Sequence, residues 1–293
     1  FSRQNAYRSL TQYMTRLTSN MIFLLIVFLA VYQAALSGYL MVNPDYFHLN
    51  SQVLETPEFR QMALGLEAEA YPMDYDRLTT LMIKYDFNLE NDHETSPDSW
   101  KKEQAKILRA KPQVYERLKN AYQTVLQDIS CFPVPRSMDP DTPWITYEND
   151  FGDERTYGGS RTHEGTDILG GQMPPGFYPV FSMTGGVIEK AGWLELGGWR
   201  IGIRAPSGAY LYYAHLYNYS QDWAEGDEVQ PGTLLGFMGD SGYGPEGTTG
   251  MFPVHLHLGI YLPLNEQEEI SVNPYWILRR SEVFIRSADY SSS

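Results

Sequence analysis

The pattern of hydrophobic and polar positions divides the chain into three stretches. Residues 21–42 are an apolar run without a charged residue. Residues 43–130 are polar and poor in glycine, and their apolar positions recur at steps of three and four, which indicates amphipathic helices. Beyond residue 144 glycines are frequent and apolar positions alternate, which is typical of β-strands. The expected fold class is α+β, with a mainly antiparallel β domain in the C-terminal half.

The apolar run at residues 21–42 is long enough to cross a membrane, because about 20 residues of helix span a hydrocarbon core of ~30 Å. Arg3, Arg8 and Arg16 precede it, and residues 1–20 contain no acid. By the positive-inside rule, residues 1–20 should be cytoplasmic and the rest of the chain extracytoplasmic. We expect a single-pass anchor in the cell membrane; the alternatives are a cleaved signal peptide and a buried core helix.

Residues 43–130 are predicted to form a helical stalk or spacer, which is also a candidate surface for an envelope protein partner. One helix is expected over 71–89, and another from Ser96, with Pro97 in its first turn. Pro112 should separate this helix from the next one. The apolar stripe of that next helix comprises Val114, Leu118, Tyr122, Val125, Leu126 and Ile129.

Residues 131–143 read CFPVPRSMDPDTP, and the four prolines favour a linker over a helix or a central strand. We therefore place a domain boundary there, with a β domain over 144–282 and a tail over 283–293. Strands are expected in the runs GGVIEKAGW, WRIGIRAP and AYLYYAHLY.

Charge and cysteine content exclude some classes of protein. The formal net charge is −14, and the basic cluster lies before residue 20, so nucleic acid is not an expected partner. The single cysteine, Cys131, excludes an intrachain disulfide framework and a cysteine-rich zinc site. It is expected to be a small core residue.

Four of the six histidines lie in the β half, and two of them stand in the run MFPVHLHLGIY at 251–261. Residues i and i+2 of a strand point to the same face, so His255 and His257 should project together, with Leu256 and Leu258 on the other face. Such a pair suits a metal ion, provided that further ligands are near.

Further ligands are offered by THEGTDIL at 162–169, in which His163 and Asp167 are four residues apart. A straight strand would separate them by about 13 Å, too far to share a zinc ion, so the chain is expected to turn, with Gly165 permitting the turn. The fourth histidine, His215, lies in YYAHLY, on a predicted strand where Tyr213 and His215 share a face.

Taken in order, these motifs resemble peptidase family M23, the LytM and lysostaphin type of zinc peptidase that cuts peptides of bacterial cell walls. The resemblance covers roughly residues 144–278 and rests on HEGTD, YYAHL, EGDEVQPGTLLGFMGDSG, HLHLGIY and VNPYWIL. It implies one zinc ion per domain, held by His163, Asp167 and His257. It further implies that His215 and His255 form the catalytic pair. The loop GYGPEGTTGMFP before the HxH motif is longer than is usual in the family.

The resemblance therefore implies a membrane-anchored zinc endopeptidase that hydrolyses peptidoglycan peptides, in the stem or in the crossbridge. Three protein ligands leave a fourth position on zinc open, which is the mark of a catalytic site. The alternative is an M23-like scaffold or binding protein of the cell envelope with little or no hydrolysis. The sequence leaves open which of His215 and His255 acts as acid and which as base.

Overall fold

A computed structural model describes residues 2–42, 49–65, 73–91, 99–156 and 159–290, and the side chains of residues 2–12 and 40–42 are not among what it describes. The chain forms two compact units, Phe1–His48 and Leu49–Ser293. Each is described separately below.

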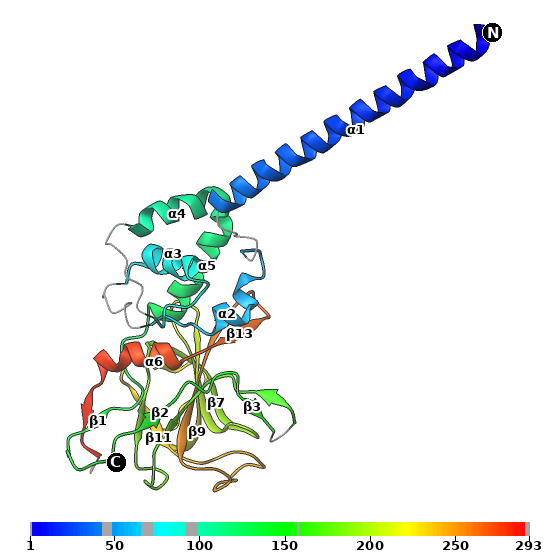
Figure 1. Ribbon diagram of the computed structural model, residues 1–293. Helices are drawn as coiled ribbons and strands as arrows, with labels where there is room; N and C mark the ends of the chain where they lie inside the picture. The colour runs from blue at the N-terminus through cyan, green and yellow to red at the C-terminus, as the bar shows by residue number, and fades with distance from the viewer. Residues whose placement is uncertain (1, 43–48, 66–72, 92–98, 157–158, 291–293) are drawn as a thin grey trace. The chain divides into compact units, whose positions relative to one another are not determined.

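The first unit contains one helix, α1 (Ser2–Val42), drawn in blue in Figure 1. Its stretch Tyr13–Tyr39 is long and apolar enough to cross a membrane, and none of it is buried against protein. The predicted apolar run at residues 21–42 therefore lies within a continuous helix. A membrane anchor and a signal sequence share these properties.

The second unit begins with a helical region. Its elements are η1 (Val53–Glu55), α2 (Pro57–Arg60), α3 (Tyr75–Lys84), α4 (Ser99–Ala110) and α5 (Pro112–Leu126). The predicted break at Pro112 is confirmed, because this proline occupies the first turn of α5. The helix predicted over 71–89 is shorter than expected, and the Asp74 side chain caps its first turn. The predicted cap at Ser96 lies outside the described residues.

Helix α5 buries the predicted stripe, with one difference at its start. Leu118, Tyr122, Val125 and Leu126 are buried, but Tyr115 replaces Val114 at the first buried position. The remaining predicted position, Ile129, is also buried, just beyond the end of the helix. The helical region is therefore held together by an apolar core.

The helical region also packs against the β region. The carboxylate of Asp128 accepts a hydrogen bond from the backbone N–H of Ser207 at 2.7 Å, and Arg60 donates to the carbonyl oxygen of Ser271 at 2.9 Å. The described residues of this helical region belong to the same compact unit as the β region. The stalk or spacer over residues 43–130 remains a prediction.

The β region is built on one sheet of ten strands, and all of its pairings are antiparallel (Figure 1). The main path runs β10-β7-β8-β9-β12-β5-β2; β11 pairs with β6 and β9, and β13 pairs with β12. The strands are β2 (Thr146–Tyr147), β5 (Thr166–Leu169), β6 (Pro179–Phe181), β7 (Gly186–Leu194), β8 (Gly198–Arg204), β9 (Tyr210–Tyr219), β10 (Glu228–Val229), β11 (Leu234–Met238), β12 (His255–Pro263) and β13 (Glu269–Val272). This confirms the predicted α+β class.

The central strands have one apolar face and one face with polar and aromatic side chains. Ile201, Leu211, Leu256 and Ile260 are completely buried, as alternation predicts for a core face. The opposite face of β12 carries His257, which is partly exposed. The expected separation of His257 from Leu256 and Leu258 is confirmed, and it leaves one face of the sheet available for chemistry.

The segment predicted as a linker is ordered by contacts with the β region. Phe132 and Val134 are buried, and the carbonyl oxygen of Pro133 accepts a hydrogen bond from Phe181 N. Strand β1 (Arg136–Ser137) pairs in parallel with β14 (Ser287–Ala288), which lies in the predicted tail. Cys131 is buried, as predicted. The domain boundary at 131–143 remains a prediction.

Three short elements complete the fold near the site and the C-terminal end. A hairpin of β3 (Glu154–Arg155) and β4 (Arg161–Thr162) precedes β5. Helix α6 (Tyr275–Ser281) and η3 (Glu282–Phe284) follow β13. The hairpin leads the chain directly into the HEGTD segment.

Candidate metal and catalytic site

Two neighbouring strands and one turn bring His163, Asp167 and His257 together. Asp167 on β5 is paired directly with His257 on β12, and His163 lies in the turn before β5. His163 Nε2 is 3.1 Å from Asp167 Oδ1 and 3.0 Å from His257 Nδ1. One ligand atom from each residue lies within 4.8 Å of the others. The chain turns as predicted, and it brings the three predicted ligands to one point.

Two residues outside the sequence motifs hold this cluster in place. His163 Nδ1 is 3.0 Å from the carbonyl oxygen of Asp150, which can only accept, so Nδ1 carries the proton and Nε2 faces the cluster. Arg155 donates to Asp167 Oδ2 at 2.9 Å and to the Asp150 carboxylate at 3.3 Å. The second carboxylate oxygen of Asp167 is therefore fixed while Oδ1 points at the histidines.

The electrostatics of the cluster favour a cation. Burial lowers the pKa of His163, but hydrogen bonds to Asp150 and Asp167 outweigh it and raise that pKa to about 9. Burial raises the pKa of Asp167, but hydrogen bonds from His163 and His257 outweigh it and hold that pKa far below its ordinary value. Two imidazole nitrogens and a carboxylate oxygen are a donor set that zinc uses, so these residues fit a zinc ion.

His215 reaches the site through an irregularity in β9. Its φ is +61°, in the left-handed region that non-glycine residues rarely adopt, and the pairing of β9 with β8 shifts register around it. The prediction that Tyr213 and His215 share a face is therefore wrong. Tyr213 points into the core, where its hydroxyl oxygen accepts a hydrogen bond from the backbone N–H of Met183 at 2.9 Å, whereas His215 faces the site.

His255 and His215 lie beside the ligand cluster with their rings close together. The ring centroids are 4.7 Å apart, and His255 Nε2 is 3.7 Å from Asp167 Oδ1. Burial lowers the pKa of both imidazoles, and for His215 neighbouring histidines lower it further. Both rings are therefore neutral near pH 7, which suits proton transfer.

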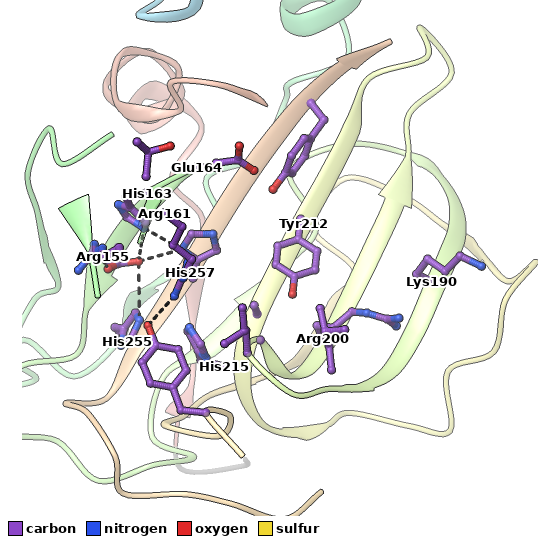
Figure 2. A pocket seen from close by; sticks show the side chains of 18 of the residues that line it. Arg155, Arg161, His163, Glu164, Lys190, Arg200, Tyr212, His215, His255 and His257 are labelled. Atoms are coloured by element: carbon purple, nitrogen blue, oxygen red, sulfur yellow. Dashed lines mark hydrogen bonds and ion pairs between the residues drawn. The ribbon is translucent and has the colours of Figure 1, made fainter. Parts of the chain in front are cut away.

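The five residues line a groove of about 750 Å³, shown in Figure 2. Tyr210, Tyr212 and Tyr261 line it as well. Glycines beneath them allow the rings to lie close to the sheet: a Cβ on Gly197 would stand 2.1 Å from the hydroxyl oxygen of Tyr212. A volume of this size falls within the range of ligand-binding pockets, ~300–1,000 Å³.

Gly165 has a different role from the one predicted. It does not adopt a positive φ, so the turn itself does not require glycine. A Cβ there would lie 2.5 Å from the carbonyl oxygen of Leu258 and 2.6 Å from the His257 ring. The glycine is needed because the HEGTD turn passes directly over the ring of a candidate ligand.

Replacing Gly165 with alanine should therefore displace the His257 ring and lower both zinc affinity and hydrolysis, with a rate loss on the order of 100-fold. Zinc titration and a peptide-cleavage assay on the purified protein measure the two effects. Gly185→Ala is the matched control, because a Cβ there meets only ordinary contacts of 3.5 Å or more. Equal zinc affinity in the two variants would refute this role for Gly165.

Sequence motifs missed four residues around the site. Asp150 and Arg155 orient ligands, and Ser241 accepts from His215 Nδ1 through its carbonyl oxygen at 2.8 Å. Arg200 lines the groove from β8. Ser241 stands in the motif EGDEVQPGTLLGFMGDSG, but no role was predicted for it. The other three residues lie outside the motifs, and no pattern in a single sequence indicates their roles.

Comparison with known proteins gives matches to the β region and beyond it. The profile of peptidase family M23 matches residues 161–274. A solved structure from Ruminococcus gnavus, provisionally named a glycyl-glycine endopeptidase lytM, is 43% identical in sequence to this chain, with a TM-score of 0.72. The match covers 83% of this chain and 97% of the Ruminococcus gnavus chain. An L-Ala--D-Glu endopeptidase of Bacillus subtilis is 42% identical over 168 residues, which are 57% of this chain. This chain spans 48% of that relative's length.

Proposed function

This chain belongs to peptidase family M23, and from that premise we propose that it is a membrane-anchored zinc endopeptidase that hydrolyses peptide bonds of bacterial peptidoglycan. One observation carries the proposal. The ligand atoms of His163, Asp167 and His257 converge within 4.8 Å on the wall of an open groove, beside two imidazoles that are neutral near pH 7. A peptidase of this class needs both features at one place.

His163, Asp167 and His257 would hold the zinc ion. When bound, zinc supplies Lewis-acid activation of water and polarisation of the scissile carbonyl. Arg155 keeps Asp167 oriented, and the carbonyl oxygen of Asp150 holds the Nδ1 side of the His163 ring, so that Nε2 faces Asp167 and His257. Such supporting contacts typically change metal affinity by about 10- to 100-fold.

His215 and His255 would move protons and stabilise charge. The Nδ1 of His215 is 2.8 Å from the carbonyl oxygen of Ser241, and that of His255 is 2.8 Å from the carbonyl oxygen of Pro253. Since a carbonyl oxygen only accepts, Nδ1 is the protonated nitrogen of each neutral ring, and Nε2 is left as the proton acceptor. Either ring can take a proton at Nε2, give it to the leaving amine, and as imidazolium stabilise an oxyanion.

The cellular setting follows from the first unit. Helix α1 offers a membrane-spanning length in Tyr13–Tyr39, and the arginines before residue 20 favour a cytoplasmic N-terminus. The unit Leu49–Ser293 would then face the peptidoglycan. The Bacillus subtilis relative is named as an endopeptidase for an L-Ala--D-Glu bond, which supports a peptide substrate of this kind.

The test is digestion of purified peptidoglycan by the full chain in detergent, before and after removal of metal by a chelator. The proposal predicts release of soluble fragments, loss of release on chelation, and recovery when zinc is returned. A protein that sediments with peptidoglycan, binds zinc and releases nothing would favour the scaffold alternative.

A further inference from the structure

Arg200 lies on the groove wall next to the bulge that carries His215. In the pairing of β8 with β9, Trp199 is opposite Leu216 and Ile201 is opposite Tyr213, so Arg200 stands opposite the bulge. Adjacent strands are about 4.8 Å apart, which places the backbone of Arg200 one strand spacing from that of His215. Figure 2 shows Arg200 to one side of the histidines, on the side that also holds Lys190.

Within the described chain, the guanidinium of Arg200 has no anionic partner. Its Nη1 is buried and meets no acceptor from the described residues. Two other cations of the groove wall have anionic partners: Arg155 bonds Asp167 at 2.9 Å, and Lys190 bonds Glu225 at 3.2 Å. A charged N–H that is shielded from solvent and unpaired is unfavourable, so this position suits an anion supplied by a ligand.

The tyrosines around Arg200 do not supply that anion. Tyr210 and Tyr212 line the same groove, and burial raises the pKa of Tyr210 to about 12 and that of Tyr212 still further above its ordinary value. Both hydroxyls are therefore neutral near pH 7. Their rings give the subsite apolar walls, and water excluded by such walls makes a guanidinium–carboxylate pair stronger than it would be in solvent.

We propose that Arg200 forms a carboxylate-binding subsite that selects peptides with a free carboxylate one or two residues from the scissile bond. The proposal rests on the proposed function and deepens it. A peptide extends by at most about 3.6 Å per residue, so one or two residues bridge the distance from the histidines to a neighbouring strand. The guanidinium fork matches a carboxylate with two parallel hydrogen bonds.

This subsite distinguishes two kinds of peptidoglycan bond. A glutamyl residue that is linked through one carboxyl group keeps the other free, whereas a glycine within a crossbridge carries no carboxylate. The subsite therefore favours a stem peptide cut next to D-Glu over a glycyl-glycine bond. The first is the bond in the name of the Bacillus subtilis relative, and the second is that in the provisional name of the Ruminococcus gnavus protein.

The experiment compares two synthetic stem peptides with a blocked (carboxamide) C-terminus, L-Ala-D-Glu-L-Lys linked through the glutamyl γ-carboxyl group and the same peptide with the free glutamyl α-carboxylate converted to a carboxamide. The zinc-loaded full chain in detergent should cleave the acid with a kcat/KM about 10- to 100-fold above that of the amide, mainly through a lower KM. Arg200→Gln should remove this preference, and Arg200→Lys should retain part of it. Lys190→Gln removes the same charge from the groove wall and should keep the parent's ratio.

The acid-to-amide ratio is measured within each preparation, so a partly misfolded variant does not imitate the expected result. Equal cleavage of both peptides by the parent overturns the inference while the proposed function stands. An unchanged ratio in Arg200→Gln, or an equal loss of preference in Lys190→Gln, overturns it too. If the parent cleaves neither these peptides nor peptidoglycan, the proposed function itself has failed.

Discussion

His257→Ala is expected to lose zinc and to abolish hydrolysis. His257 would supply one of the three candidate ligand atoms, and its Nδ1 lies 3.0 Å from Asp167 Oδ1 and 3.0 Å from His163 Nε2. Removing it leaves two candidate ligands, His163 and Asp167. Loss of supporting contacts around a metal already weakens binding by about 10- to 100-fold, so loss of a direct ligand should exceed that range.

Zinc content after gel filtration and the rate of peptide cleavage measure this effect. Tyr261→Phe is the matched control, because Tyr261 lies on the same strand as His257, also lines the groove, and is not among the candidate ligands. The control should keep one zinc per chain. If His257→Ala binds zinc as firmly as the control does, the ligand assignment is wrong.

His215→Ala and His255→Ala should each keep zinc and lose turnover. Neither side chain belongs to the group of three ligand atoms, yet both rings adjoin it and present Nε2 toward the groove. The loss of a proton-transfer or oxyanion group typically costs on the order of 10²- to 10⁴-fold in rate. The expected fall is in kcat, with a smaller change in KM, because these groups act on the reacting atoms.

Paired zinc analysis and steady-state kinetics on each variant test this division of roles. The pH profile adds a second readout, because removing an acid or base should abolish one limb of the profile. Near-parental kcat in both variants would contradict the catalytic assignment. Loss of zinc in both would instead make His215 and His255 part of the metal site.

The sequence predicted the ligand cluster because its signals are local. Alternation at residues 255–258 required only a regular strand, and β12 is regular there. The spacing of His163 and Asp167 excluded a straight strand, since the two side chains had to reach one ion. Both predictions depended on short-range geometry that holds in any surroundings.

The departures have long-range causes. His215 leaves the face predicted for it because the bulge at this position arises in the pairing of β9 with β8, and no periodicity reveals where such a bulge falls. The role of Gly165 depends on the distance to Leu258 and His257, which are far away in the sequence. Arg155 contacts Asp167 from the β3–β4 hairpin, and Asp150 contacts His163 from the segment before that hairpin. No local sequence pattern reveals these contacts.

The helical region shows the same limit. The periodicity of residues 112–126 predicted a helix and most of its buried face. The periodicity did not reveal that the helix belongs to the same compact unit as the sheet. The hydrogen bond between Asp128 and Ser207 joins residues that are 79 positions apart in the sequence. A helical pattern predicts which face of the helix is buried, but it does not show which element covers that face.

The most direct test of the central claim is a titration of the metal-free full chain with zinc, with release of new amino groups from purified peptidoglycan as the readout. We predict that the rate of hydrolysis rises in proportion to the added zinc and stops rising at one equivalent per chain. His257→Ala should show no such rise. Hydrolysis by the metal-free protein at the full rate, or an equal rise in His257→Ala, would contradict it.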